Sequence, residues 1–251
     1  MKIIAFYSIK GGVGKTAACV NVAYWAGRQG FSILLCDLDL QGSASYYFRI
    51  KSHKKFNTKK LLKGGKSVEK NIMETDFENL DLLPSDISYR NLDLKLDNLK
   101  NSRERLKKVI CSLNTFYDFI FLDCPPNLTL VSENIFFAAD YLFVPVIPTP
   151  LSKLTYIKLI KFFKSHHLDR SKIKAFFSMV ENRKKLHREL INTLSQKNAR
   201  FLKSQIPYSA DVEKMGVYRK PLLSTSLTSK ASLSYVSLWQ EIRSLINQPN
   251  V

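Results

Sequence analysis

The sequence of 251 residues lacks several features that mark membrane, secreted and zinc-binding proteins. No stretch approaches the roughly 20 consecutive apolar residues of a membrane-spanning helix. Met1 and Lys2 lead straight into a short apolar run, so we expect no signal peptide. The four cysteines form no CxxC pair and have no zinc-ligand spacing. We interpret them as small buried apolar residues in a reducing compartment. An iron–sulfur cluster is the alternative, but no cysteine pair matches one.

Acidic residues are scarce, because the chain has 21 Asp and Glu against 39 Lys and Arg, a formal net charge of +18. The positive charge is unevenly distributed. Residues 51–70 contain eight basic residues and one acidic residue, and residues 151–251 contain 19 and six. A concentrated basic surface indicates a polyanionic partner, for which DNA, RNA and an acidic membrane are all candidates. The alternative is a lysine-rich composition whose charges are simply solvated.

Internal repeats and low-complexity linkers are also absent, and we expect residues 1–251 to form a single domain. Apolar runs that alternate with helical patterns predict an α/β fold, in which helices cover both faces of a mostly parallel, twisted sheet. Pro145 predicts that the end of its strand leaves the sheet, and the polar, basic segment 51–66 is expected to be a mobile surface excursion. The strands are expected near residues 2–8, 32–37, 80–84, 118–123, 141–147, 173–180 and 202–206, and the helices near residues 16–29, 90–112, 129–138, 152–165, 184–197 and 232–247.

Glycine is sparse, with nine residues, yet three of them lie within residues 11–14. The segment Lys10–Thr16, KGGVGKT, follows an apolar run and opens into a helical stretch. This order is typical of a phosphate-binding loop, because glycine lets backbone N–H groups turn toward an anion and the helix N-terminus adds partial positive charge. In such a loop Lys15 would reach the β- and γ-phosphates, and the Thr16 hydroxyl would hold Mg²⁺. A glycine turn with two solvated lysines is the alternative.

Two further apolar runs end in aspartate. Residues 34–42 read LLCDLDLQG and place Asp37 and Asp39 at a predicted strand end, and residues 117–126 read YDFIFLDCPP and place Asp123 at another. Because the carboxyl ends of parallel strands meet at one edge of a sheet, we expect these acids to lie beside the phosphate loop. Acids that only cap strand exits are the alternative.

Together the three motifs resemble the ParA/MinD family of ATPases. An ordinary P-loop has glycine five positions before Gly14, where this chain has Ile9, and the pair that follows Lys10 is instead the deviant loop of that family. The resemblance continues through later tracts near residues 138–152, 178–183 and 206–216. It implies a small, single-domain ParA with the three-layer fold of P-loop NTPases, without the N-terminal helix-turn-helix region of larger relatives, and with ATP and Mg²⁺ as cofactors.

The resemblance also implies residue roles. Lys10 would reach across to the nucleotide of a second subunit, and Asp39 would orient the attacking water, so that Lys10, Lys15 and Asp39 are the expected catalytic residues. Mg²⁺ would be held by Thr16, Asp37 and Asp123. Two departures from the family pattern are Leu40, where proline is usual, and Ala17, where a second hydroxyl is common. The expected nucleotide-binding residues are Lys10, Gly11, Gly12, Val13, Gly14, Lys15, Thr16, Ala17, Pro207 and Asp211.

For function, the resemblance implies a homodimer that closes around two ATP molecules and hydrolyses them slowly until a partner stimulates it. The dimer would bind double-stranded DNA nonspecifically, act with a ParB-like centromere-binding protein, and partition plasmid or chromosome DNA. We expect it in the cytoplasm on the nucleoid, without stable membrane association. The expected DNA contacts are basic residues of the C-terminal third, namely Lys203, Arg219, Lys220, Lys230 and Arg243.

Two alternatives belong to other functional classes. A MinD-like ATPase would bind a membrane surface through a C-terminal amphipathic helix. Residues 233–246 do carry an apolar stripe, which includes Leu238, Trp239 and Ile242, but Arg243 is the only cation beside it. We therefore expect this helix to dock on the core. The other alternative is an ATPase that positions a protein complex, which the sequence does not separate from DNA partitioning.

Overall fold

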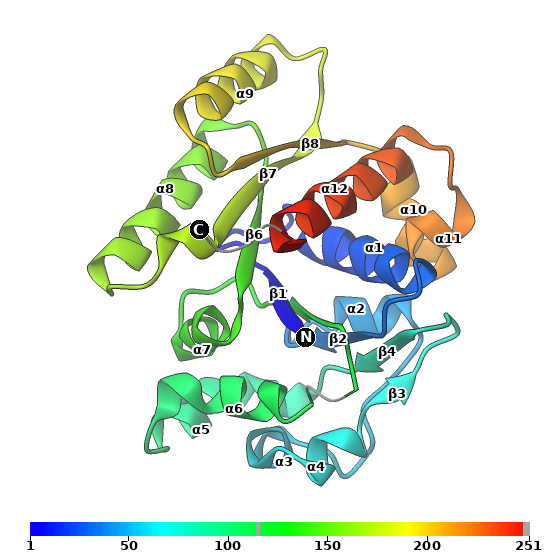
Figure 1. The fold of residues 1–251 in the computed structure, drawn as a ribbon, viewed down its shortest axis with the longest axis vertical. Helices are drawn as coiled ribbons and strands as arrows, with labels where there is room; N and C mark the ends of the chain where they lie inside the picture. Colours follow the sequence, from blue (N-terminus) through cyan, green and yellow to red (C-terminus); the bar gives the residue numbers. More distant parts are fainter. Residues whose placement is uncertain (114–115, 248–251) are drawn as a thin grey trace.

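The computed structural model describes residues 1–113 and 116–247. Within these residues eight strands form one sheet in the order β3-β4-β2-β5-β1-β6-β7-β8 (Figure 1). Neighbouring strands are parallel, except that β3 runs antiparallel to β4. The predicted α/β fold class is therefore confirmed. The strands are β1 (Lys2–Phe6), β2 (Ile33–Asp37), β3 (Met73–Glu74), β4 (Leu80–Leu83), β5 (Phe119–Asp123), β6 (Tyr141–Val146), β7 (Ile173–Val180) and β8 (Phe201–Pro207).

Alternate side chains of each central strand enter two separate cores. In β1, Ile3 and Ala5 pack into one core, and Ile4 and Phe6 pack into the other. Successive side chains of a strand point to opposite faces. A strand that is buried on both faces is therefore apolar along its whole length, which is why β1, β2 and β5 appear in the sequence as unbroken apolar runs.

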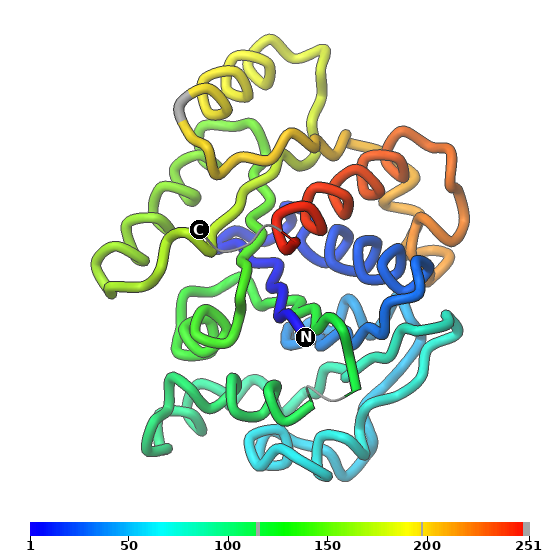
Figure 2. Tube along the Cα trace, in the orientation of Figure 1, coloured from blue at the N-terminus to red at the C-terminus, as the bar shows by residue number. Residues whose placement is uncertain are grey.

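Helices cover both faces of the sheet. Figure 2 shows the C-terminal helix, in red, beside the first helix, in blue, on one face. That face carries α1 (Lys15–Arg28), α2 (Ser43–Tyr47), α10 (Ala210–Tyr218), α11 (Leu222–Thr225) and α12 (Lys230–Asn247). The other face carries α3 (Thr58–Lys63), α4 (Lys66–Glu69), α5 (Leu92–Asp97), α6 (Arg105–Cys111), α7 (Leu130–Ala138) and α8 (Pro150–Ser165). The helix α9 (Lys185–Lys197) packs against β7, and three short 3₁₀ helices are η1 (Ile87–Asn91), η2 (Ser102–Glu104) and η3 (Arg170–Lys172).

Two predictions about the segments between strands were wrong. The single helix expected over residues 90–112 is broken into α5 and α6, because Asn101 adopts the left-handed conformation, φ 62°, between them. The segment 51–66, expected to be a mobile excursion, contains α3. Its residues Phe56, Leu61 and Leu62 are buried in the core, so apolar packing fixes this segment to the sheet.

Pro145 does not end its strand, in contrast to the prediction. It remains in register with Phe176 of β7, while the pairing of β6 with β1 stops at Phe143. A proline lacks the N–H that a central strand would donate. Here Pro145 lies beyond the last residue of β6 that pairs with β1, so no β1 partner requires that N–H.

Helix α12 is docked on the core, as expected. Leu238, Trp239 and Ile242 have no exposed surface, and the Trp239 indole donates a hydrogen bond of 2.8 Å to the Gln29 side chain. Of the helices in the described ranges, none combines the length and the apolar character that a bilayer crossing demands.

Candidate nucleotide site

The loop after β1 requires glycine at defined positions. Gly12 and Gly14 have φ of 70° and 86°, a conformation that glycine adopts without steric cost. A Cβ atom on Gly14 would also lie 2.8 Å from the Ser178 hydroxyl oxygen. Gly11 has ordinary φ and open space around its Cα, so the packing of this chain alone does not require glycine there.

Helix α1 begins directly after this loop and has no side-chain cap. Gly14 occupies the cap position, and the first turn contains no acidic residue. The first N–H groups of a helix have no intrahelical partner, so here they are available to an anion. Lys15 lies in the same turn and is only 6% exposed. A buried ammonium group requires an opposite charge nearby, and Asp123 is close enough to interact with it.

Asp37 and Asp123 end the adjacent parallel strands β2 and β5 and are register partners. Both are fully buried. The chain itself satisfies Asp37, whose Oδ2 accepts hydrogen bonds from the Ser45 N–H at 2.8 Å and the Ser45 hydroxyl at 2.7 Å. Its Oδ1 accepts the Asp39 N–H at 3.3 Å. Neither oxygen of Asp123 has a partner of hydrogen-bond geometry among the described residues.

The charges of these two carboxyl groups are therefore poorly compensated. Burial and the charge of Asp37 raise the pKa of Asp123, the charge of Lys15 and the nearby Thr16 hydroxyl lower it, and the resulting pKa is about 8. Burial also raises the pKa of Asp37, to about 6, against the hydrogen bonds from Ser45. Two adjacent buried carboxyl groups of raised pKa form a site where a cation would be favoured.

The oxygen ligands at this edge fit Mg²⁺, which nucleotide phosphates help to bind, better than a metal ion whose ligands all come from the protein. No group of three or more His, Cys, Asp or Glu side chains in the described ranges could enclose a metal ion. Mg²⁺ is typically held by one or two carboxylates together with substrate phosphates and water. Asp123, with its unpartnered oxygens, and the neighbouring Thr16 hydroxyl have that character. Asp37 already accepts hydrogen bonds from Ser45 and has less free bonding capacity for the ion.

Asp39 lies in a tight turn beside these acids. It is 8% exposed, and its Oδ1 accepts the Gln41 N–H at 3.0 Å. Its carbonyl accepts the Gly42 N–H at 2.9 Å and the Ser85 hydroxyl at 2.5 Å. The turn is therefore fixed from both sides, and Asp39 keeps its second carboxylate oxygen for other partners. Lys10 lies at the start of the loop, half-buried, and forms no ion pair with the residues that the structure describes.

The two nucleotide-binding residues expected far along the chain have different locations. Pro207 lines a small pocket that also includes Gly14, Ser178, Tyr208 and Tyr235. Asp211 is outside this pocket and lies 3.1 Å from the Lys214 ammonium group. Ser178 and Tyr208 belong to the tracts 178–183 and 206–216 of the family resemblance, but their place beside Gly14 depends on the pairing of β7 with β8.

Ser45 and Ser85 were also missed as supporting residues of the site. The Ser45 hydroxyl donates to Asp37 and accepts the Ser85 N–H at 2.9 Å, so it joins the two turns next to the acids. Both are ordinary serines in the sequence, and no pattern distinguishes them before the fold is known.

The five predicted DNA contacts lie in three parts of the fold, namely β8, the turn after α10, and α12. Lys203, on β8, and Lys230, which begins α12, are exposed, whereas Lys220 is half-buried. Arg219 is engaged within the chain, because its guanidinium lies 4.5 Å from the Tyr46 ring centroid and its Nε donates to the Tyr46 carbonyl at 3.1 Å. The Arg243 guanidinium lies 5.1 Å from the Phe31 ring centroid.

Comparison with known proteins identifies the family. The sequence model of the family described as an AAA domain matches residues 1–178. A virulence plasmid ParA family protein of Chlamydia psittaci is 27% identical, with 96% of this chain and 94% of that protein covered. The sporulation initiation inhibitor protein Soj of Bacillus subtilis is 28% identical, with 96% and 98% covered.

Solved structures share the fold over nearly the whole chain. A putative plasmid partition protein of Borrelia burgdorferi, bound to AMPPNP, has a TM-score of 0.84 at 24% identity and covers 97% of this chain and 99% of its own. The septum site-determining protein MinD of Pyrococcus horikoshii, complexed with Mg-ADP, has a TM-score of 0.78 at 22% identity and covers 98% and 97%. The fold and the sequence similarity agree with the site geometry, which comprises the glycine loop, the buried Lys15 and the paired aspartates. The chain therefore belongs to the ParA/MinD family of P-loop ATPases.

Proposed function

We propose that the protein is an ATP-dependent, dimerising ATPase that binds DNA without sequence preference and partitions plasmid or chromosome DNA. Its partner would be a ParB-like centromere-binding protein, and it would act in the cytoplasm on the nucleoid. The observation that carries the proposal is the meeting of an uncapped helix α1, the buried Lys15 and the unpartnered Asp123 at one edge of the sheet. Similarity to a plasmid ParA protein and to Soj supports the partitioning role.

ATP and Mg²⁺ are the ligands that fit this edge. The backbone N–H groups of Gly14, Lys15 and Thr16 would bind phosphate oxygens, and the Lys15 ammonium would neutralise their charge. Asp123 and the Thr16 hydroxyl would hold Mg²⁺, which when bound supplies positive charge to the β- and γ-phosphates. Pro207 would lie near the base, since its pocket adjoins Gly14.

Hydrolysis would depend on Asp39 and on a second subunit. Asp39 has a free carboxylate oxygen in a fixed turn and would orient the attacking water. Lys10 would point across the dimer interface at the partner's γ-phosphate, where a cation stabilises the charge of the transferring phosphoryl group. Gly11, which the chain's own packing does not require, would leave room for that close approach. Until a partner protein stimulates it, turnover would be slow.

DNA binding would be electrostatic. The net charge of +18 provides the cations, and counterion release would make the affinity fall steeply with salt. Dimerisation doubles the basic surface, so ATP would raise DNA affinity through avidity. Exposed Lys203 and Lys230 are the best placed of the C-terminal candidates.

The proposal is tested by binding to random-sequence duplex DNA with a nonhydrolysable ATP analogue, with ADP and without nucleotide. We expect a dimer by light scattering and tight DNA binding only with the analogue. Equal DNA affinity in all three states, or a monomer saturated with the analogue, contradicts the proposal.

A MinD-like role at a membrane surface is the second candidate, because MinD of Pyrococcus horikoshii shares the fold. The buried face of α12 argues against it, and deleting this helix would remove core residues. A sharper variant is Leu233→Glu, at a side chain that is 55% exposed. ATP-dependent sedimentation of the intact protein with anionic vesicles, abolished by this substitution, supports the membrane role over DNA partitioning.

A further inference from the structure

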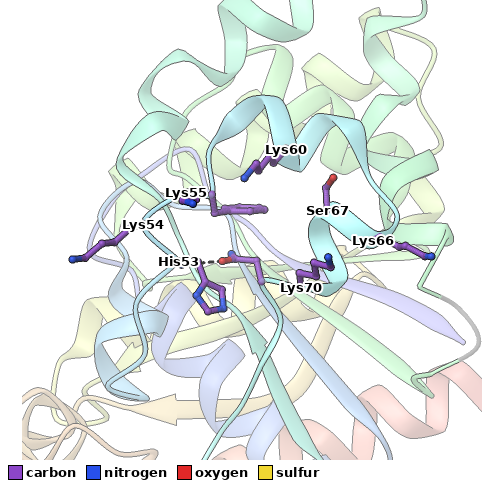
Figure 3. Close-up of a pocket in the computed structure, with 9 residues that line it drawn as sticks. His53, Lys54, Lys55, Lys60, Lys66, Ser67 and Lys70 are labelled. Carbon is purple, nitrogen blue, oxygen red and sulfur yellow. Dashed lines mark hydrogen bonds between the residues drawn. The ribbon is translucent and has the colours of Figure 1, made fainter.

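Two basic cavities flank the short helix α3, one on each side. The first is lined by His53, Lys54, Lys55, Lys60, Lys66 and Lys70. In Figure 3, Lys54 and Lys66 lie at opposite rims with Lys60 and Lys70 between them. The second cavity is lined on the other side of α3 by Lys59, Lys63, Lys95 and Arg105. We call the cations of both cavities the α3 basic surface.

Within the described residues no carboxylate compensates the positive charge of this surface, although Arg105 donates hydrogen bonds to the Leu62 and Lys63 carbonyls. None of the ion pairs found in the described residues includes a cation of the α3 basic surface. No acidic residue lines either cavity. The basic and acidic residues of the α4 region face different cavities. Lys66 and Lys70 line the first cavity, whereas Glu69 lines another cavity together with Glu74 and Asp81. Like charges that are gathered without counter-ions favour an anionic ligand.

A buried amide gives the first cavity a second anion-binding feature. Asn71 is 1% exposed and lines the cavity. Its Oδ1 accepts the His53 N–H at 3.0 Å, and its Nδ2 group remains able to donate to another partner. This Nδ2 has no hydrogen-bond partner in the described chain. A buried donor without an acceptor destabilises the fold, so an anion that reaches Nδ2 from among the lysines would supply the missing acceptor.

The extent of the surface indicates a polymer. A small anion would occupy one cavity and leave the cations across α3 unused, whereas a phosphate backbone could follow both. The lining contains no exposed Phe, Tyr or Trp side chain, since its one residue of these types, Phe56, is 6% exposed. Binding of single-stranded nucleic acid depends on exposed aromatic rings on which bases stack. We propose that the α3 basic surface binds the phosphate backbone of duplex DNA, as a second contact besides the C-terminal candidates. This inference rests on the proposed DNA-partitioning function.

The second contact is well separated from the first. Helices α3 and α4 lie beside the β3–β4 edge of the sheet, whereas β8, which carries Lys203, is the opposite edge strand. Figure 1 places α3 and α4 at one end of the molecule and β8 toward the other. A subunit with basic surfaces at both edges could contact two duplex segments, or one bent segment.

The test compares three variants of the full chain in the ATP-analogue state on random-sequence duplex DNA. One carries Lys60→Ala, Lys66→Ala and Lys70→Ala. The second carries Lys203→Ala and Lys230→Ala. The matched control carries Lys158→Ala, Lys161→Ala and Lys164→Ala, which removes three exposed lysines of α8. Basal ATPase activity and melting temperature are measured for each, since none of these lysines belongs to the nucleotide site.

We expect the α3 variant to lose DNA affinity by tenfold or more. Its slope of log K against log salt should fall by about three, because each phosphate contact contributes about 0.9. The α8 control should keep the wild-type affinity and slope. Unchanged DNA binding of the α3 variant, with reduced binding of the Lys203/Lys230 variant, overturns this inference alone. Wild-type protein that does not bind DNA overturns the proposed function as well.

The membrane alternative is tested in parallel with vesicles that contain phosphatidylglycerol. If the α3 variant retains DNA binding and loses vesicle binding, the surface is a lipid-binding one and the DNA inference is wrong.

Discussion

Asp37 and Asp123 are register partners on β2 and β5, and of the two only Asp37 accepts hydrogen bonds from the residues that the structure describes. The two carboxylates are therefore different in function although they are neighbours in space. Asp37 acts as an internal anchor for Ser45 and for the Asp39 turn. Asp123 is a buried carboxyl group whose oxygens remain available to a cation.

The first prediction concerns the substitution Asp123→Asn. Without ligand, this variant should be more stable than the wild type, because it removes a buried carboxylate whose ionised form is disfavoured. With Mg²⁺ and ATP the order should reverse, because the metal ligand is lost. Thermal melting with and without Mg-ATP measures both effects. Asp97→Asn, at an exposed position, is the control and should change neither value.

The same residue gives a pH dependence. The pKa of Asp123 is raised from an ordinary value of 3.8 to about 8. The folded state thus binds more protons than the unfolded state between these values, and stability falls as pH rises across that range. We expect the free energy of unfolding of the ligand-free wild type to decrease from pH 5 to pH 8 more steeply than that of Asp123→Asn. Parallel curves for the two proteins contradict the burial argument.

The framework of the site could be predicted because its signals are local. An apolar strand buried on both faces gives an unbroken apolar run, and the aspartates at the ends of β2 and β5 mark the edge where ligands bind. The break between α5 and α6 could not be predicted, because residues 98–101, NLKN, contain neither glycine nor proline to mark the end of a helix. The contacts of Ser45 with Asp37 and of Arg219 with Tyr46 could not be predicted for another reason, since these partners are brought together by packing and not by sequence spacing.

A second prediction separates backbone strain from steric contact at the loop glycines. Gly14→Ala meets both a φ of 86° and the Ser178 hydroxyl, Gly30→Ala meets only the same φ in open space, and Gly11→Ala meets neither. A left-handed conformation costs a non-glycine residue about 1–2 kcal/mol. The free energy of unfolding in urea should therefore fall most for Gly14→Ala, less for Gly30→Ala and least for Gly11→Ala. Equal losses at Gly14 and Gly30 would show that Ser178 moves away freely.

A third prediction concerns Asp39 and Lys15. Asp39→Ala should keep nucleotide affinity and dimer formation while hydrolysis stops, because the carboxylate would orient water and does not bind phosphate. Lys15→Ala should instead lose ATP binding, because the phosphates lose their buried cation. Fluorescent-nucleotide titration and phosphate release measure the two steps separately. If Asp39→Ala hydrolyses ATP at the wild-type rate, Asp39 does not orient the attacking water.

The final prediction concerns Ser45, which connects Asp37 at the end of β2 to the Ser85 turn. Ser45→Ala deletes a donor to a buried carboxylate and the acceptor of the Ser85 N–H. A hydrogen bond to a charged group contributes about 1.5–3 kcal/mol, so we expect the free energy of unfolding to fall by about 2 kcal/mol. Because Asp39 is held by the same turn, hydrolysis should fall more than nucleotide affinity.

Ser43→Ala is the matched control, since Ser43 lies in the same helix α2 and makes no side-chain hydrogen bond within the described residues. The double variant Asp37→Asn with Ser45→Ala tests the contact itself. Once Asp37 is neutral, deletion of the Ser45 hydroxyl should cost less than it does in the wild type, and the difference is the coupling free energy of the pair. If Ser45→Ala costs no more than Ser43→Ala, the hydroxyl does not hold Asp37, and the rigidity of the Asp39 turn must come from Ser85 and Gly42 alone.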